Sequence, residues 1–521
     1  MALTLFSLLE KGYFPRELPP SFNTKSYATY LAAPGVTAPK GKFTSKPSYS
    51  MQTTHNLARS GGLRRNLSIP NPKHFYLLAD HIVTNWANIK AKTDRSPYSM
   101  TKPVEIGTDR AITPEHGLSE RVNKQAELRS SNRFIIRADV SRFFPSIYTH
   151  SIPWALMGKS IAKSAHTTNT LVNTWQDMCD KYSQKINNNQ TIGIPIGPDT
   201  SRLLAEIIMA EIDVLLAKKF KRLKGLRFID DYEFACPTRA EAEKILYYLQ
   251  YLLNEYELAL NINKTKIVEL PEELESTMIS KVRTFFFRDA GKTGQKNDLI
   301  AYFNLVFEAI KIALDENLLK YAIARLTAVT IAAENWILYQ NILSQCVVSD
   351  PSCLPQVCDQ LSLYLSRGYK PAISIWEKCL NIVVTEKVPL GLSSECAWAI
   401  WVLKVLNIKL SIKSAKAISE TDDSVVALMG LGMASVGLAQ MKYFSTLNRY
   451  AIASELFEKQ WLLCYQGNLT GWLGSSSGKH NLNGDPAFDY LQGNNVSFFD
   501  FASPPKIPII VAGTGGSGGG Y

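Results

Sequence analysis

The order of apolar and polar residues divides the chain into a mixed first half and a helical second half. Residues 133–139 (RFIIRAD) form a β-branched and aromatic run that predicts a buried strand ending on a carboxylate. Apolar residues at helical spacing follow Asp199 and predict a long helix. The segment LRFIDDYEFAC predicts two short strands joined by a hairpin turn at Asp230 and Asp231. From about 297 to 472, long stretches of helical pattern separated by short loops predict an all-α region.

Shifts in composition divide the chain into four segments: an N-terminal arm at 1–60, a core at 61–290, a helical domain at 291–475 and a tail at 476–521. The first segment is rich in Pro, Ser, Thr and Tyr and has little periodicity, so we expect an extended arm with a short leading helix. The helical segment has no clean repeat period, although stacked helical pairs of the HEAT-like kind suit its composition. The tail is polar and Gly-rich, and we expect it to be flexible unless something holds it.

The charge of the chain is placed unevenly. Its 57 Lys and Arg residues exceed its 46 Asp and Glu residues, for a formal net charge of +11. Residues 1–130 hold 18 basic and 9 acidic residues, so most of the excess lies in the first quarter of the chain. Clustered Lys and Arg favour a polyanionic partner, because binding to phosphates releases counterions. A solvated basic face is the alternative interpretation.

Composition argues against several classes of protein. With 46% apolar and 20% charged residues, the chain is typical of a globular protein rather than a disordered one. The longest uncharged apolar run, residues 425–441, is better explained by a buried helix than by a membrane span, and the N-terminus lacks the pattern of a secretory signal. Eight cysteines without a CxxC pair argue against zinc ribbons and a disulfide framework, so we expect a reducing cytoplasm.

Acidic residues at two places in the chain suggest a metal-dependent reaction. Asp139 ends one predicted strand, and Asp230 and Asp231 lie at the predicted hairpin tip. Three converging carboxylates suit two Mg²⁺ ions, with Mn²⁺ as an alternative, because these hard cations take oxygen ligands and keep positions open for substrate phosphates. The pattern therefore predicts two-metal phosphoryl transfer, whereas an isolated Asp pair would be read as a simple turn.

Four motifs in one order carry a family resemblance. ADVSRFFPSIY, GIPIGPDTSRLLAEI, FIDDY and NINKTK, within roughly 60–290, resemble the palm motifs A to D of reverse transcriptases. The resemblance implies an α+β right-hand polymerase with palm and fingers, followed by an all-α, HEAT-like C-terminal domain. It also implies that Asp139 and Asp230 are the principal metal ligands and Asp231 the third carboxylate.

The resemblance extends to residues that would handle the nucleotide. Phe144 matches the steric gate that excludes a 2′-hydroxyl and so favours deoxynucleoside triphosphates, although one of Phe143 and Phe144 is expected to be a core residue. Gly197 matches the glycine that lets the backbone approach nucleotide and template. LRRNLSIP resembles the fingers motif of retron-type enzymes and places Arg65 at the triphosphate, with Arg64 able to share that role.

Motif D supplies a candidate cation. Lys264 in NINKTK is expected to protonate or stabilise the leaving pyrophosphate, with Lys266 as the competing choice.

Departures from the family pattern indicate a lineage. Phe228 stands where Tyr is usual, and Ile196 gives Pro-Ile-Gly where Pro-Gln-Gly is usual. With the helical second half, these features resemble bacterial abortive-infection and defence-associated reverse transcriptases of the retron- and group II-like type. That resemblance implies homo-oligomers, a structured non-coding RNA partner and, for some members, DNA synthesis primed by a protein hydroxyl. The terminal Tyr521, on its Gly-rich tether, is the candidate primer, with Tyr27 and Tyr30 as alternatives.

The sequence thus predicts a cytoplasmic bacterial RNA-directed DNA polymerase that acts in antiphage defence. Three alternatives remain: template-independent or homopolymeric DNA synthesis by the same site, a catalytically idle RNA-binding scaffold, and a group II intron maturase. The scaffold is disfavoured because an idle site has no physical reason to keep three mutually repelling carboxylates. The maturase is disfavoured because no endonuclease-like segment is visible.

Overall fold

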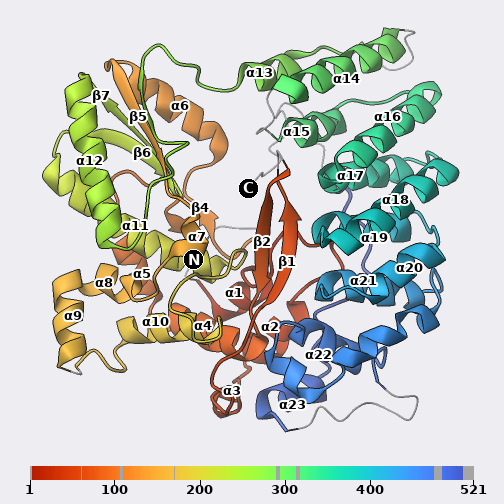
Figure 1. Ribbon diagram of the computed structural model, residues 1–521, viewed down its shortest axis with the longest axis horizontal. Coiled ribbons are helices and arrows are strands. Elements are labelled where there is room, and N and C mark those ends of the chain that lie inside the picture. Colours follow the sequence, from red (N-terminus) through yellow and green to blue (C-terminus); the bar gives the residue numbers. More distant parts are fainter. Residues whose placement is uncertain are drawn as a thin grey trace.

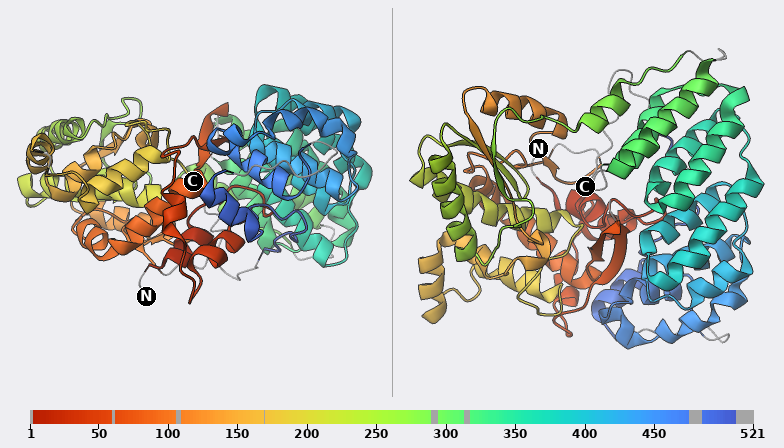
Figure 2. Two further views of the ribbon diagram at one scale, coloured as in Figure 1. Left: turned by 90° about the horizontal axis from the view of Figure 1, so that it is seen from below. Right: turned by 45° about the horizontal axis from the view of Figure 1, so that its top comes forward.

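The structure is a computed structural model that describes residues 3–59, 62–105, 109–168, 170–288, 294–312, 317–474 and 484–508. A mixed α/β half and a helical half lie side by side, and the N-terminal helices lie between them (Figures 1 and 2). No helix in these ranges is long and apolar enough to cross a membrane.

The mixed half is built on an antiparallel sheet of four strands, in the order β6 (Lys224–Phe228), β7 (Asp231–Cys236), β5 (Phe134–Asp139) and β8 (Lys266–Glu269). One face carries Tyr232 and Phe234 toward α11 (Asp199–Lys219) and α12 (Arg239–Glu255). The other face carries Leu226 and Ala235 toward α6 (Leu118–Arg129). The alternation of side chains along each strand thus places two separate apolar layers on the two faces.

The N-terminal segment is not an extended arm, contrary to the expectation from its composition. It forms α1 (Leu5–Lys11), α2 (Lys25–Ala32), α3 (Lys40–Phe43) and β1 (Thr53–Ala58). Tyr13 and Tyr27 are fully buried, against α4 (Pro72–Thr84) and the C-terminal part of the chain. The helices are short and separated by loops, so they hold too few turns for a helical period to be visible in the sequence.

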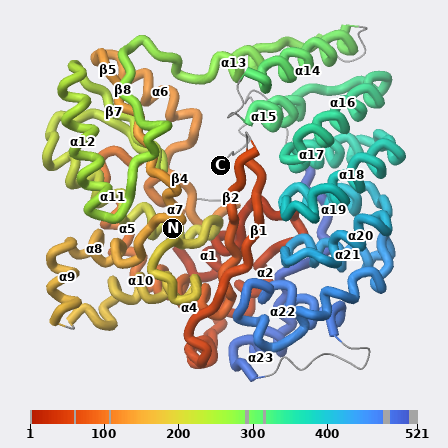
Figure 3. Tube along the Cα trace, in the orientation of Figure 1, coloured from red at the N-terminus to blue at the C-terminus, as the bar shows by residue number. Residues whose placement is uncertain are grey.

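A hairpin of two strands connects the halves. β1 pairs with β2 (Arg64–Ile69), from Thr53 opposite Ile69 to Ala58 opposite Arg64, so the boundary expected at residue 60 falls inside one hairpin. On the palm side, the Ser68 amide donates to the Ile196 carbonyl at 2.8 Å. On the other side, the Ala58 amide donates to Ser394 Oγ at 3.0 Å, in the helical half. The hairpin stands between the halves in Figure 3.

The second half contains only helices among its regular elements within 294–312 and 317–474, as the sequence predicts. The main ones are α14 (Gly294–Ile312), α15 (Leu318–Arg325), α16 (Trp336–Ser349), α17 (Leu354–Ser366), α18 (Ile373–Lys387), α19 (Ser393–Val405), α20 (Ile412–Ser419), α21 (Ser424–Ser435) and α22 (Trp461–Leu469). From α15 to α21, each helix contacts the one two positions later. The apolar run at 425–441 includes α21, whose residues are almost all buried.

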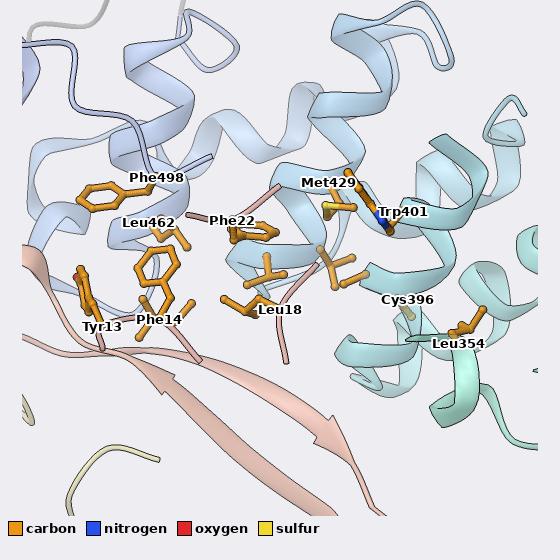
Figure 4. Close-up of a cluster of buried hydrophobic side chains, with 14 of the residues drawn as sticks. Tyr13, Phe14, Leu18, Phe22, Leu354, Cys396, Trp401, Met429, Leu462 and Phe498 are labelled. Carbon is orange, nitrogen blue, oxygen red and sulfur yellow. The ribbon is translucent and has the colours of Figure 1, made fainter. Parts of the chain in front are cut away.

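The described part of the tail is held in place, so it is not a free polar tail. It contains α23 (Pro486–Gly493) and an apolar segment at 496–501. Phe498 is fully buried, and the centre of its ring lies 6.3 Å from that of Tyr13 (Figure 4). It also lies 5.5 Å from the ring of Trp461 on α22. Lys73 of α4 also forms a buried ion pair with Asp485. These contacts join the two ends of the described chain to each other.

A buried ion-pair network joins the sheet to α11. The guanidinium of Arg227 on β6 donates to Glu206 at 2.8 and 3.0 Å and to Asp213 at 2.9 Å. It also donates to the carbonyl of Ile229 at 2.7 Å, while the Tyr232 hydroxyl donates to Asp213 at 2.7 Å. Although burial lowers it, the pKa of Arg227 is raised above its ordinary value by the two carboxylates. The cation therefore fixes both α11 and the turn that follows β6.

Replacing this cation should destabilise the palm. Arg227→Met leaves Glu206 and Asp213 buried without a partner, which should cost about 3 to 5 kcal/mol of unfolding free energy. Calorimetric unfolding of the full chain measures the loss. The control is Arg239→Met, which breaks an exposed pair with Glu243 and should cost less than about 1 kcal/mol. Equal effects of the two substitutions would contradict the role given to Arg227.

Candidate active site

Three carboxylates lie at one end of the sheet. Asp139 ends β5 and is paired in register with Asp231, the first residue of β7. Asp230 lies in the two-residue turn between β6 and β7, next to Ile229, whose φ is +59°. Strand β5, strand β7 and the turn thus bring together the three acidic residues that the sequence singled out.

The carboxylates repel one another. Burial, together with the charges of Asp231 and Asp139, raises the pKa of Asp230 to about 7, against a smaller opposing effect of Arg65. The Asp231 side chain is 45% exposed, yet its partial burial raises the pKa of its carboxyl group. Arg121 opposes this shift, and Asp139 adds to it. Burial and mutual repulsion thus act against ionisation of the carboxylates, while Arg65 and Arg121 favour it.

Two residues of the loop after α12 contact Asp139. The Asn261 amide nitrogen donates to the backbone carbonyl of Asp139 at 2.7 Å, and Asn261 Nδ2 donates to Oδ1 at 3.0 Å. Lys264 Nζ lies 3.2 Å from Asp139 Oδ2, on a side chain that is 61% exposed. Lys266 instead lies 3.9 Å from Glu272. Of the two lysines considered from the sequence, the structure brings Lys264 to the carboxylates.

The two arginines of β2 point to different parts of the protein. Arg64 forms a bidentate ion pair with Glu395 of α19, at 2.6 and 2.9 Å, and also donates to Asn56. Arg65 lies close enough to Asp230 to oppose the rise in its pKa, while burial and the nearby Arg59 lower the pKa of Arg65 itself. Alternation along the strand thus gives Arg64 to the helical half and Arg65 to the acidic end of the sheet.

Phe144 lies beside the hairpin turn. Helix α7 (Phe143–Ser146) follows β5, and Phe143 is buried while Phe144 is half-buried. A small pocket between α7, α11 and the turn is lined by Phe144, Ile229, Arg202 and Glu206, among others. The expectation that one of the two phenylalanines belongs to the core agrees with the burial of Phe143, which also lines this pocket, and the gate role of Phe144 stays a prediction.

Gly197 contacts the N-terminal segment. Its φ is +131°, and a Cβ there would lie 2.5 Å from Pro15 Cγ. Its carbonyl accepts a hydrogen bond of 2.8 Å from Arg110, which also pairs with the buried Asp199 at 2.7 Å. Packing against Pro15 therefore requires a glycine at this position, in addition to the approach to nucleotide and template that the resemblance implies.

Two residues at the site escaped the sequence analysis. Arg121 of α6 lies 3.9 Å from Asp231 and has its guanidinium 5.5 Å from the centre of the Phe228 ring. Asn261 begins the NINKTK motif, and its position beside a lysine candidate was the available signal. No local pattern marked Arg121, because α6 reaches the site only through the tertiary fold.

The donor atoms of the site fit hard cations. Within the described residues, no group of three or more His, Cys, Asp or Glu side chains is arranged as a ready metal site. Asp139, Asp230 and Asp231 nevertheless supply only carboxylate oxygens, which Mg²⁺ prefers. Burial first, and the neighbouring carboxylates second, raise the pKa of Asp230, and a bound cation would favour its charged form.

Residues 97–292 match the family model described as reverse transcriptase (RNA-dependent DNA polymerase). The chain therefore contains a reverse transcriptase domain, and domains of this family are RNA-directed DNA polymerases, which are nucleotidyltransferases. A search of curated proteins gives no match.

Solved telomerase structures are among the matches. Telomerase from Candida albicans, in complex with a fragment of telomeric RNA, has 11% identity over 68% of this chain and 65% of its own, with a TM-score of 0.31. Telomerase from Candida tropicalis without its C-terminal domain has 15% identity over 44% of this chain and 52% of its own, with a TM-score of 0.30. The matched part of this chain thus spans less than two thirds of the length of either telomerase chain.

Proposed function

We propose that this protein synthesises DNA on an RNA template by two-metal nucleotidyl transfer at Asp139, Asp230 and Asp231. The observation that carries the proposal is the register of β5 and β7, which sets Asp139 opposite Asp231 with Asp230 in the adjoining turn. This arrangement lies inside the segment that matches the reverse transcriptase family.

Two Mg²⁺ ions, or Mn²⁺, would be held by these three carboxylates. When bound, such ions lower the pKa of the attacking primer hydroxyl and stabilise the pyrophosphate that leaves. Lys264 supports this assignment, because its ammonium now lies beside Asp139 and is exposed enough to turn toward the triphosphate. There it would stabilise or protonate the leaving group.

The nucleotide would be positioned by Arg65, Phe144 and Gly197. Arg65 lies on the Asp230 side of the hairpin and is suited to grip triphosphate oxygens, since its guanidinium has paired donors. The half-buried Phe144 ring, beside the turn that carries Asp230, would exclude a 2′-hydroxyl and favour deoxynucleoside triphosphates. Arg64 takes no part, because Glu395 holds it.

The role of the chain would be antiphage defence in the bacterial cytoplasm, on a structured non-coding RNA and as a homo-oligomer. The support is the motif resemblance together with the helical half, where contacts between each helix and the one two positions later suit a HEAT-like stack. The basic N-terminal quarter would contact the RNA, although Lys40 there pairs with Asp80 at 2.7 Å.

Template-independent DNA synthesis by the same site is the second candidate. It is favoured by the contact between Pro15 and Gly197, which covers the glycine expected to face nucleotide and template. Incorporation assays with and without an RNA template separate the two candidates, since only templated synthesis yields a complementary product.

Removing the acidic pair of the turn should abolish catalysis. The double change Asp230→Asn and Asp231→Asn should lower nucleotide incorporation by at least roughly 10²- to 10³-fold. The thermal midpoint should stay level or rise, because carboxylate repulsion is relieved. Glu269→Gln is the matched control, since this carboxylate lies at the other end of β5. Incorporation that survives the double change would leave the RNA-binding scaffold as the better account.

Single substitutions of Phe144 and Arg65 should affect sugar selection and triphosphate binding separately. Phe144→Ala should raise the use of ribonucleotides relative to deoxyribonucleotides roughly 10- to 200-fold, the range for a small steric contact. Arg65→Ala should raise the KM for both nucleotides alike, and Arg64→Ala should leave the KM unchanged. Steady-state kinetics with each nucleotide measures these effects. An unchanged sugar preference in the Phe144 variant would move the gate to Phe143.

Priming from a protein hydroxyl remains a prediction, because Tyr521 lies outside the described residues. Tyr521→Phe removes only the hydroxyl, so it should abolish DNA linked to the protein while extension of a supplied primer continues. Mass spectrometry of nuclease-treated protein measures the adduct. A nucleotide found on another residue, such as Tyr27 or Tyr30, would exclude Tyr521 from the reaction; the burial of Tyr27 makes it the poorer alternative.

A further inference from the structure

A basic segment, called here the basic loop, runs from the last two residues of α11 to the first residue of β6. Five of the seven residues at 218–224 are Lys or Arg, and all five side chains are exposed: Lys218, Lys219, Lys221, Arg222 and Lys224. None of them forms a salt bridge with any carboxylate in the described ranges, and two acidic residues of the flanking helices, Glu211 and Glu255, are already paired with Lys92 and Lys159. The loop therefore carries a local positive charge that the protein does not neutralise.

Aromatic rings of α12 adjoin this loop. Tyr247 is 73% exposed and Tyr251 is 49% exposed. The rings of Tyr248 and Tyr251 are stacked, with centroids 5.7 Å apart and an angle of 28°. Lys219 Nζ lies 5.7 Å from the centre of the Tyr248 ring, so the loop and the tyrosines form one surface. We call the five basic residues together with Tyr247, Tyr248 and Tyr251 the lysine–tyrosine surface.

The lysine–tyrosine surface is separate from the acidic end of the sheet. Lys224 begins β6, whereas Asp230 lies two residues beyond the last residue of that strand, Phe228. At about 3.3 Å per residue, the length of the strand places the two ends roughly 13 Å apart. Helix α12 lies on the outer side of the palm, away from the helical half (Figures 1 and 2).

We propose that the lysine–tyrosine surface binds single-stranded nucleic acid, RNA or DNA. Exposed lysines that lack carboxylate partners gain free energy from phosphates through counterion release. Exposed tyrosine rings offer stacking platforms to unpaired bases, whereas paired bases in a duplex keep their faces covered. The combination of both on one surface favours a single strand over a duplex. The inference does not depend on polymerisation, since it concerns binding alone.

Binding of a short fluorescent single strand, without nucleotides, tests the proposal. Fluorescence anisotropy is measured at several salt concentrations, with RNA and DNA strands of the same sequence as separate arms to distinguish the two sources. Replacing Lys218, Lys219 and Lys221 by Gln should flatten the log-log salt dependence by about two units, at roughly 0.7 per phosphate on a single strand. The control changes Lys409, Lys413 and Lys416, which are exposed on the helical half, to Gln.

The tyrosines should affect affinity but not salt dependence. Tyr247→Ala and Tyr251→Ala should each weaken binding roughly 5- to 150-fold if one base stacks on each ring, with little change in slope. The loop and tyrosine changes should cause the same losses of binding in an Asp230→Asn background, where the proposed catalysis is removed, so failure of the polymerase proposal and failure of this one are distinguishable.

Several results would overturn the proposal. These are an unchanged slope in the loop variant, an equal loss in the helical-half control, or tighter binding of a duplex than of a single strand. If the loop variant loses binding to vesicles of phosphatidylserine and phosphatidylcholine but still binds the strand, the surface is a membrane contact instead.

Discussion

The buried ion pairs of Arg227 are the constraint on which the candidate site depends. One cation satisfies Glu206 and Asp213 on α11 and holds the carbonyl of Ile229 at the turn that carries Asp230. Such a group is costly to bury alone, so the sheet, the helix and the turn must form together. The turn can thereby hold clustered carboxylates whose repulsion would otherwise loosen it. The ion pairs of Arg227 on one face of the sheet thus stabilise the turn that carries Asp230 at its end.

Besides the covalent chain, aromatic and polar contacts connect the two halves of the molecule. Phe498 lies among rings from the first 30 residues and from α22, and Lys73 pairs with Asp485. The hairpin of β1 and β2 gives Arg64 to the helical half and leaves Arg65 near Asp230. A shift of the helical half against the palm would therefore reach the acidic end of the sheet through this hairpin.

Local patterns predicted the individual strands and the hairpin turn, because strand composition and turn chemistry act over a few residues. The meeting of Asp139 with Asp230 and Asp231 was expected from the resemblance of the four motifs to those of reverse transcriptases, and the order of the strands was not predicted. The packing of Tyr13 against Phe498 could not be predicted, because those residues are hundreds of positions apart and their neighbours are rich in Pro or Gly. Pro15 against Gly197 is a similar case, since the motif explains the glycine without reference to the first residues of the chain.

The most direct test of the account is primer extension by the purified full chain on an RNA template of known sequence, with the divalent cation removed by a chelator and then restored. The account predicts DNA whose sequence is complementary to the template, no product in the chelated sample, and recovery when Mg²⁺ or Mn²⁺ is added. Product that forms equally in the chelated sample, or the absence of product under all conditions, would contradict it.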